Sequence, residues 1–193
     1  LLRRTSSHTA LIGACFPAAG VGLVRRSYSA TLSRMNAAAP ILIGYDGSDT
    51  ARRAVQEAAE LFGSRRALVA TVWEPGLAYQ VGAMSTDPTG LGPAPVDPVA
   101  AQEVDDASQA HADRVAEEGA ALAKSLGLQA EALAVADESV VADAIVEVAR
   151  KRGVAAVVVG SRGLSGLRAR LEGSTSNAVA KHASCPVLLV HDD

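Results

Sequence analysis

Two glycine-rich segments near the C-terminus contain the residue types that proteins use to bind anions. They are Gly160-Ser161-Arg162-Gly163 and, after nine intervening residues, Gly173-Ser174-Thr175-Ser176. Glycine lets a backbone approach a ligand without a Cβ clash, and the free N–H groups of a loop and of a helix start attract negative charge. The hydroxyls of the second segment add further hydrogen-bond donors. The pattern predicts a phosphate-binding loop.

The same residues also have a simpler interpretation. An ordinary turn followed by a serine N-cap would explain the glycines and hydroxyls. Arg162, Arg168 and Arg170 form a basic cluster in an otherwise acidic domain, where they can be phosphate ligands or solvated loop charges. The Walker pattern and the Gly-x-Gly-x-x-Gly dinucleotide fingerprint are both absent. Taken alone, the two segments leave both interpretations open.

The elements that position these segments follow from hydrophobic periodicity. Apolar runs predict strands, and apolar residues at helical spacing predict helices. The expected strands are residues 41–45, 67–73, 128–135, 155–159 and 187–190, and the expected helices are residues 51–62, 102–125, 141–152 (capped by Ser139) and 174–182. Residues 74–99, dense in proline and glycine, are expected to form a long loop.

This alternation predicts an α/β fold, an open doubly wound sheet of five parallel strands with helices on both faces. Ligands of such sheets bind at the carboxyl ends of the strands, where the strand order reverses. Two segments that follow strands then become candidate sites, the glycine-rich loop after Val159 and the acidic turn Asp46-Gly47-Ser48-Asp49 after Tyr45. Glu117 and Glu118, in the long polar helix, are expected to lie on a solvated face.

Residues 1–34 differ in character from the rest. They contain five arginines and no acid, which leaves 13 basic and 21 acidic residues in the folded domain expected at 35–193. The segment is expected to be disordered. It is either an organellar transit peptide or an over-extended start ahead of Met35, and we favour the second. The expected location is accordingly cytoplasmic, with a mitochondrial or plastid matrix as the alternative.

Composition excludes several classes of protein. Of the 193 residues 49% are hydrophobic and 3% aromatic, yet no apolar stretch is long enough to span a membrane. The net charge of −3 argues against a general nucleic-acid binder, so neither nucleic acid nor membrane is an expected partner. The two cysteines, Cys15 and Cys185, form no disulfide framework, and no residue cluster has metal-ligand spacing.

Several separated motifs together resemble the universal stress protein family. The spacing Gly160, two residues, Gly163, nine residues, Gly173-Ser174 matches the ATP-binding signature of that family. Residues 41–48 resemble its first strand and acidic turn, and residues 157–163 and 184–190 resemble its fourth and fifth strands. The resemblance covers about residues 40–191.

The resemblance implies an adenine nucleotide alpha-hydrolase-like fold with strand order 3-2-1-4-5. It also implies ATP in the crevice between the first and fourth strands, Mg²⁺ or Mn²⁺ on the phosphates, and a homodimer built on the last strand. Gly44 and Asp46 would lie beside the adenosine, and Val72 would offer its backbone to the adenine. The residues expected along the ribose and phosphates are Gly160, Ser161, Arg162, Gly163, Gly173, Ser174, Thr175 and Ser176.

The function that the resemblance implies is an ATP-binding module of the stress response, without catalytic residues, that regulates an unidentified protein partner. One alternative is a nucleotide-free dimerising stress protein. Another is a slow ATPase, or a protein that phosphorylates itself on Ser174 or Ser176. Adenylyl-transferring proteins of related architecture carry His-x-Gly-His or Ser-Gly-Gly-x-Asp-Ser, and neither occurs here.

Overall fold

A computed structural model describes residues 9–12, 38–84, 96–137, 140–160 and 175–191, and the structural statements below concern these residues. Six strands lie in them: β1 (Thr9–Ile12), β2 (Ile41–Gly44), β3 (Arg66–Trp73), β4 (Gln129–Ala136), β5 (Ala156–Gly160) and β6 (Val187–Val190). Five helices accompany them: α2 (Asp49–Phe62), α3 (Leu77–Met84), α4 (Pro98–Ser125), α5 (Val141–Arg152) and α6 (Thr175–His182).

The strands form a single sheet in the order β1-β6-β5-β2-β3-β4. The pairs β2–β3, β3–β4, β2–β5 and β5–β6 are all parallel. Counted along the chain from β2, these five strands have the order 3-2-1-4-5, so the predicted fold class is confirmed.

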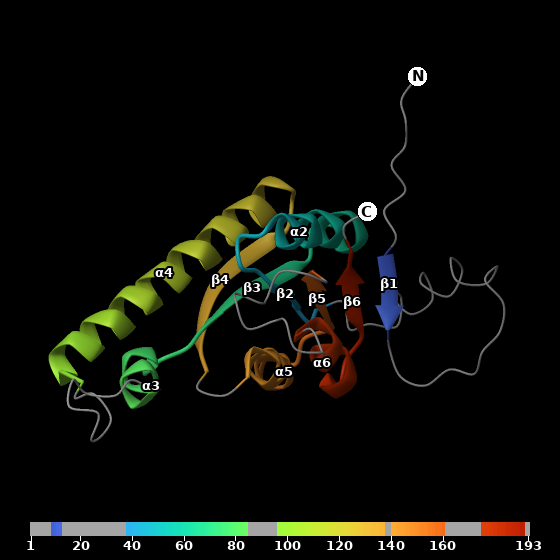
Figure 1. Cartoon of the computed structure of the whole chain (residues 1–193). Coiled ribbons are helices and arrows are strands. Elements are labelled where there is room, and N and C mark those ends of the chain that lie inside the picture. Colours follow the sequence, from blue (N-terminus) through green and yellow to red (C-terminus); the bar gives the residue numbers. More distant parts are fainter. Residues whose placement is uncertain (1–8, 13–37, 85–95, 138–139, 161–174, 192–193) are drawn as a thin grey trace.

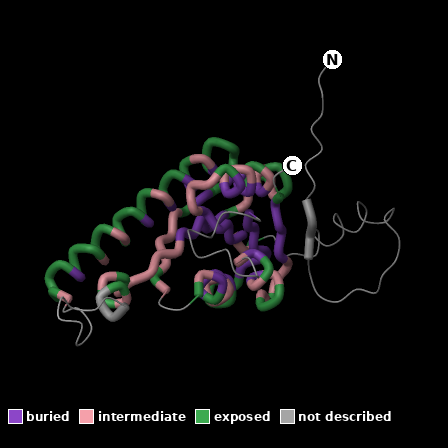
Figure 2. The backbone as a smooth tube through the Cα atoms, in the orientation of Figure 1, coloured by how far each residue is buried: buried purple, intermediate pink, exposed green. Residues whose placement is uncertain are grey.

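Helices cover both faces of the sheet (Figure 1). On one face, α2 and α4 pack on the odd-numbered residues of β2 and β3, such as Ile43 and Val69. On the other face, α5 and α6 pack on residues of opposite parity, such as Leu42 and Leu68. Figure 2 shows the buried residues concentrated in the sheet and on the helix faces turned toward it. This alternation is the period-2 signature of strands that are buried on both faces.

Local sequence signals define the helix boundaries. The Ser48 hydroxyl accepts a hydrogen bond from the Ala51 N–H and caps α2, as the polar cluster there predicts. Asp97 caps α4, and Pro98 suits its first turn because the fixed φ of proline is already helical. Gly153 ends α5 in the left-handed conformation. The residue at the N-cap of α5 is Val140, which makes no side-chain cap, and Ser139 lies outside the described residues.

The expectation of a long loop with little regular structure over residues 74–99 is wrong at both of its ends. Helix α3 forms near the start, and α4 begins at Pro98, four residues before the predicted position. The reason is a contact distant in sequence. Both carboxylate oxygens of Asp105 in α4 accept the Gly76 N–H, at 2.9 and 3.0 Å, and this satisfies a free donor at the start of α3. Residues 85–95 lie outside the described residues.

Part of the segment expected to be disordered is a strand. Thr9–Ile12 form β1, which pairs antiparallel with all four residues of β6. An open sheet edge presents unpaired N–H and C=O groups, and an apolar segment of the same chain can pair with them. The remainder of the segment, residues 1–8 and 13–34, lies outside the described residues.

Candidate functional site

The carboxyl ends of β2 and β5 lie where the strand order reverses. The chain leaves β2 for β3 on one side, while β5 pairs with the other side of β2. Gly44 and Gly160 end these two strands, and both are buried. Thr50 in the first turn of α2 lies directly against Gly160, because a Cβ at Gly160 would stand 2.7 Å from the Thr50 Cγ2. The start of α2, which follows the turn after β2, therefore meets the end of β5.

The turn after β2 is held by its own side chains. One Asp46 carboxylate oxygen accepts the Ser48 N–H at 3.0 Å, and Gly47 adopts a φ of +78°, which favours glycine. The Arg52 guanidinium donates to the Gly47 carbonyl oxygen at 2.6 Å. Asp46 itself is half-buried. The Asp46 carboxylate is therefore fixed at the carboxyl end of β2.

A buried hydroxyl ties the end of β2 to β3. The Tyr45 N–H donates to the Ala70 carbonyl oxygen at 2.9 Å, which continues the ladder by one bond. The Thr71 hydroxyl then donates to the Tyr45 carbonyl oxygen at 2.8 Å. Thr71 is a single polar residue within a buried strand, and that pattern is the sequence signal for such a bond.

The carbonyl group of Val72 lies on the β2 side of β3. Carbonyl groups alternate between the two sides of a strand in a parallel sheet. The Ala70 carbonyl accepts from Tyr45 on the β2 side, and the Trp73 carbonyl accepts from Asp137 on the β4 side. The Val72 carbonyl therefore points to the β2 side. Because the ladder register of β2 ends at Gly44, opposite Ala70, Val72 extends beyond it.

The second glycine segment enters the described residues at Thr175, the first residue of α6. Thr175 is half-buried and Ser176 is buried. The Ser176 hydroxyl donates to the Gly160 carbonyl oxygen at 2.7 Å, so it joins the start of α6 to the end of β5. The hydroxyl hydrogen of Ser176 therefore takes part in a hydrogen bond within the fold.

The structure thus places six of the eleven predicted site residues: Gly44, Asp46, Val72, Gly160, Thr175 and Ser176. They lie at the carboxyl ends of β2, β3 and β5 and at the start of α6. The other five lie outside the described residues, and they are Ser161, Arg162, Gly163, Gly173 and Ser174. Thr50 and Thr71 contact these segments, and neither was among the residues predicted from the sequence.

Tyr45 is a buried titratable residue directly before the Asp46 turn. Burial, followed by the hydrogen bond and charge of Glu118, raises the pKa of Tyr45 to about 12, so its hydroxyl remains a donor at neutral pH. Burial raises the pKa of the Cys185 thiol. Within the described ranges, no three His, Cys, Asp or Glu side chains gather as a metal site would require. Over the same residues, no helix combines the length and apolar character needed to cross a bilayer.

The chain matches a protein family over most of its length. Residues 38–191 match the model of the universal stress protein family, which is most of the chain. The chain belongs to this family. Its relatives include universal stress protein YxiE of Bacillus subtilis, which is 29% identical over 150 residues, covering 78% of this chain and 97% of the relative.

Solved structures of universal stress proteins share the fold. One was determined in complex with cAMP; it is 28% identical, with a TM-score of 0.52 and coverage of 82% of this chain and all of that one. UspA from Lactobacillus plantarum is 22% identical, with a TM-score of 0.56 and coverage of 80% and 99%. These matches support the same sheet order.

Proposed function

We propose that this universal stress protein binds ATP in the crevice between β2 and β5 and acts as a nucleotide-responsive regulatory module. The observation that carries the proposal is the Val72 carbonyl, which points toward the β2 side beyond the last ladder residue of β2. A backbone acceptor at a switch point suits the exocyclic amine of adenine. The family relative solved with cAMP, an adenine nucleotide, supports the same class of ligand.

The proposed roles follow from position. Gly44 and Asp46 border the adenosine, and Gly160, with its Cβ position already filled by Thr50, lies below the ribose. Ser161, Arg162, Gly163, Gly173 and Ser174 contact the ribose and phosphates. Thr175 and Ser176 contribute through the start of α6, where backbone N–H groups favour an anion. For Ser176 this contribution is the backbone alone, since its hydroxyl is bonded to Gly160.

A divalent cation fits this site only through the nucleotide. Mg²⁺ and Mn²⁺ prefer hard oxygen ligands and commonly retain waters and phosphate oxygens. The hydroxyls of Ser174 and Thr175 are the proposed protein ligands. We propose at most slow hydrolysis or self-phosphorylation, with Ser174 as the acceptor because the Ser176 hydroxyl is buried.

The first experiment identifies the bound nucleotide. The full chain is purified without added nucleotide and denatured, and released small molecules are identified by chromatography and mass. We expect ATP at close to one molecule per chain. Calorimetric titration of nucleotide-free protein with ATP, AMP and cAMP, each with and without Mg²⁺, then ranks the ligands. An empty protein that binds none of them would contradict the proposal and favour the nucleotide-free alternative.

We also propose a homodimer that forms through β6. In the structure both sides of β6 are occupied, because β5 pairs with one side and β1 with the other. A second copy can pair there only after β1 leaves. The proposed dimer and the observed β1 contact therefore exclude one another.

Proline substitutions in β1 test this competition. The variant Ala10→Pro/Leu11→Pro removes backbone donors from the strand and should release β6, because proline cannot donate to a sheet ladder. Sedimentation velocity should show a larger dimer fraction than in the wild type. The control Ala10→Val/Leu11→Val keeps both backbone donors in β1 and should leave the fraction unchanged. An unchanged fraction in the β1 variant would contradict a dimer through this edge.

A further inference from the structure

One carboxylate in α4 connects the two ends of the turn that contains Asp46. The Glu118 Oε1 atom accepts the Tyr45 hydroxyl at 3.0 Å and the Arg52 guanidinium at 2.6 Å. Tyr45 directly precedes the turn, and Arg52 donates to the Gly47 carbonyl inside it. Glu118 was expected to lie on a solvated helix face. Although its side chain is half exposed, it has two partners that are 66 and 73 residues away along the chain.

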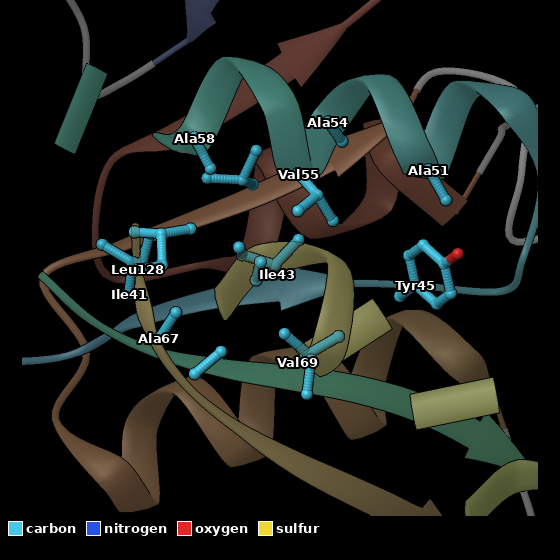
Figure 3. Close-up of a cluster of buried hydrophobic side chains, with 14 of the residues drawn as sticks. Ile41, Ile43, Tyr45, Ala51, Ala54, Val55, Ala58, Ala67, Val69 and Leu128 are labelled. Carbon is cyan, nitrogen blue, oxygen red and sulfur yellow. The ribbon is translucent and has the colours of Figure 1, made fainter. Parts of the chain in front are cut away.

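The helix itself lies close to the same turn. Gly119 of α4 has no room for a side chain, because a Cβ there would stand 2.7 Å from the Tyr45 ring. A Cβ at Gly47 would stand 3.9 Å from Val115, one turn of α4 earlier. Figure 3 shows the Tyr45 ring on the sheet near Ala51, under the first turn of α2. The turn therefore lies between two helices, and Glu118 links them.

The partner of Tyr45 is energetically important. Tyr45 is fully buried, and a buried phenol without an acceptor is costly. The Arg52–Glu118 pair is 41% and 52% exposed, so by itself it contributes little to stability. The pair instead fixes the orientation of the Arg52 guanidinium, which donates to the Gly47 carbonyl. Both contacts constrain the backbone on either side of Asp46.

We infer that Glu118 is a positioning residue for the nucleotide site, which holds the Asp46 turn through Tyr45 and Arg52. This inference rests on the proposed function, since Asp46 is proposed to border the adenosine. Glu118 has no contact with the ligand in this scheme. Its removal should loosen the turn and weaken nucleotide binding, while the sheet and the other helices remain folded.

The test compares the full chain with Glu118→Ala, Glu118→Gln and the neighbouring control Glu117→Gln. Glu117 is exposed on the same helix turn. Calorimetry with ATP and Mg²⁺ should show affinity reduced about 3- to 10-fold in Glu118→Ala. Glu118→Gln keeps an acceptor for Tyr45 and should recover part of the loss. Glu117→Gln should bind like the wild type.

Two further readouts separate positioning from general destabilisation. In a Tyr45→Phe background the Glu118→Ala change should cost less affinity, because one of the two connections is already absent. Ultraviolet titration of tyrosinate should show a lower pKa for Tyr45 in Glu118→Gln, since the charge of Glu118 contributes to raising it. Tyr45→Phe identifies that transition among the three tyrosines.

Amide exchange of the Asp46–Ser48 turn, measured without nucleotide, tests the positioning role of Glu118 separately from the proposed nucleotide binding. Faster exchange in Glu118→Ala, confined to this turn, would show that Glu118 holds the turn. If the wild type bound no adenine nucleotide, that result would contradict the proposed function but not the role of Glu118 in holding the turn. Unchanged exchange, or ATP affinity in Glu118→Ala equal to or above wild type, would overturn the inference. If Glu118→Ala does not fold, Glu118→Gln provides the same measurements.

Discussion

Gly119→Ala should lower the free energy of unfolding by about 2 kcal/mol, although alanine is the better helix former. In an exposed helix this change would stabilise by about 0.5–1 kcal/mol. Here the added Cβ would stand 2.7 Å from two atoms of the Tyr45 ring and 2.8 Å from Val69 Cγ1. Both neighbours belong to the buried centre of the sheet, and overpacking of such a core typically costs 1–3 kcal/mol. The steric effect should therefore exceed the helix propensity.

Denaturant unfolding of the wild type and Gly119→Ala measures this difference. Glu117→Ala is the matched control, because it places alanine on the exposed side of the same helix and should change stability by less than about 0.5 kcal/mol. A Gly119→Ala protein as stable as the wild type, or more stable, would show that α4 can move away from Tyr45. The positioning role of Glu118 depends on the close approach of α4 to Tyr45, and that result would contradict it.

The open parallel sheet was predictable because its determinants are local, whereas its strand order 3-2-1-4-5 was implied by the resemblance to the universal stress protein family. Apolar runs such as residues 41–44 and 156–160 are too short for helices, and a right-handed crossover rule leaves few ways to arrange parallel strands. The N-cap at Ser48 and the C-cap at Gly153 follow from residue type alone. Helix α3 could not be predicted in this way. Its anchor is Asp105, which lies 29 residues beyond Gly76 in the chain.

The candidate site was predictable in part for the same reason. Gly44 and Gly160 end strands and Asp46 follows one, so their position at the switch point results from topology. The groups that hold them come from elsewhere: Thr71 on Tyr45, Ser176 on Gly160, and Glu118 on Tyr45 and Arg52. Ser176 is an instructive case. Its hydroxyl was expected to face a phosphate, and its observed partner is a backbone carbonyl 16 residues away.

Gly160→Ala should reduce both stability and nucleotide affinity, because Gly160 is where α2 contacts the end of β5. A Cβ there would stand 2.7 Å from Thr50 Cγ2 and 3.1 Å from the Thr50 backbone carbon. Thr50 is buried, and the turn that contains Asp46 immediately precedes α2. The start of α2 therefore cannot shift to make room for the added Cβ without moving this turn. We expect a loss of about 1–3 kcal/mol in the free energy of unfolding.

The double variant Gly160→Ala/Thr50→Ser separates the two contacts. Serine lacks the Cγ2 methyl that stands nearest, so it should restore part of the stability, but the contact with the Thr50 backbone remains. ATP affinity should fall at least tenfold in Gly160→Ala and recover partly in the double variant, with Thr50→Ser alone as the control. Equal losses in Gly160→Ala and the double variant would show that the methyl contact is unimportant. Full affinity in Gly160→Ala would place the nucleotide away from the switch point, because a shifted Asp46 turn could not then matter to binding.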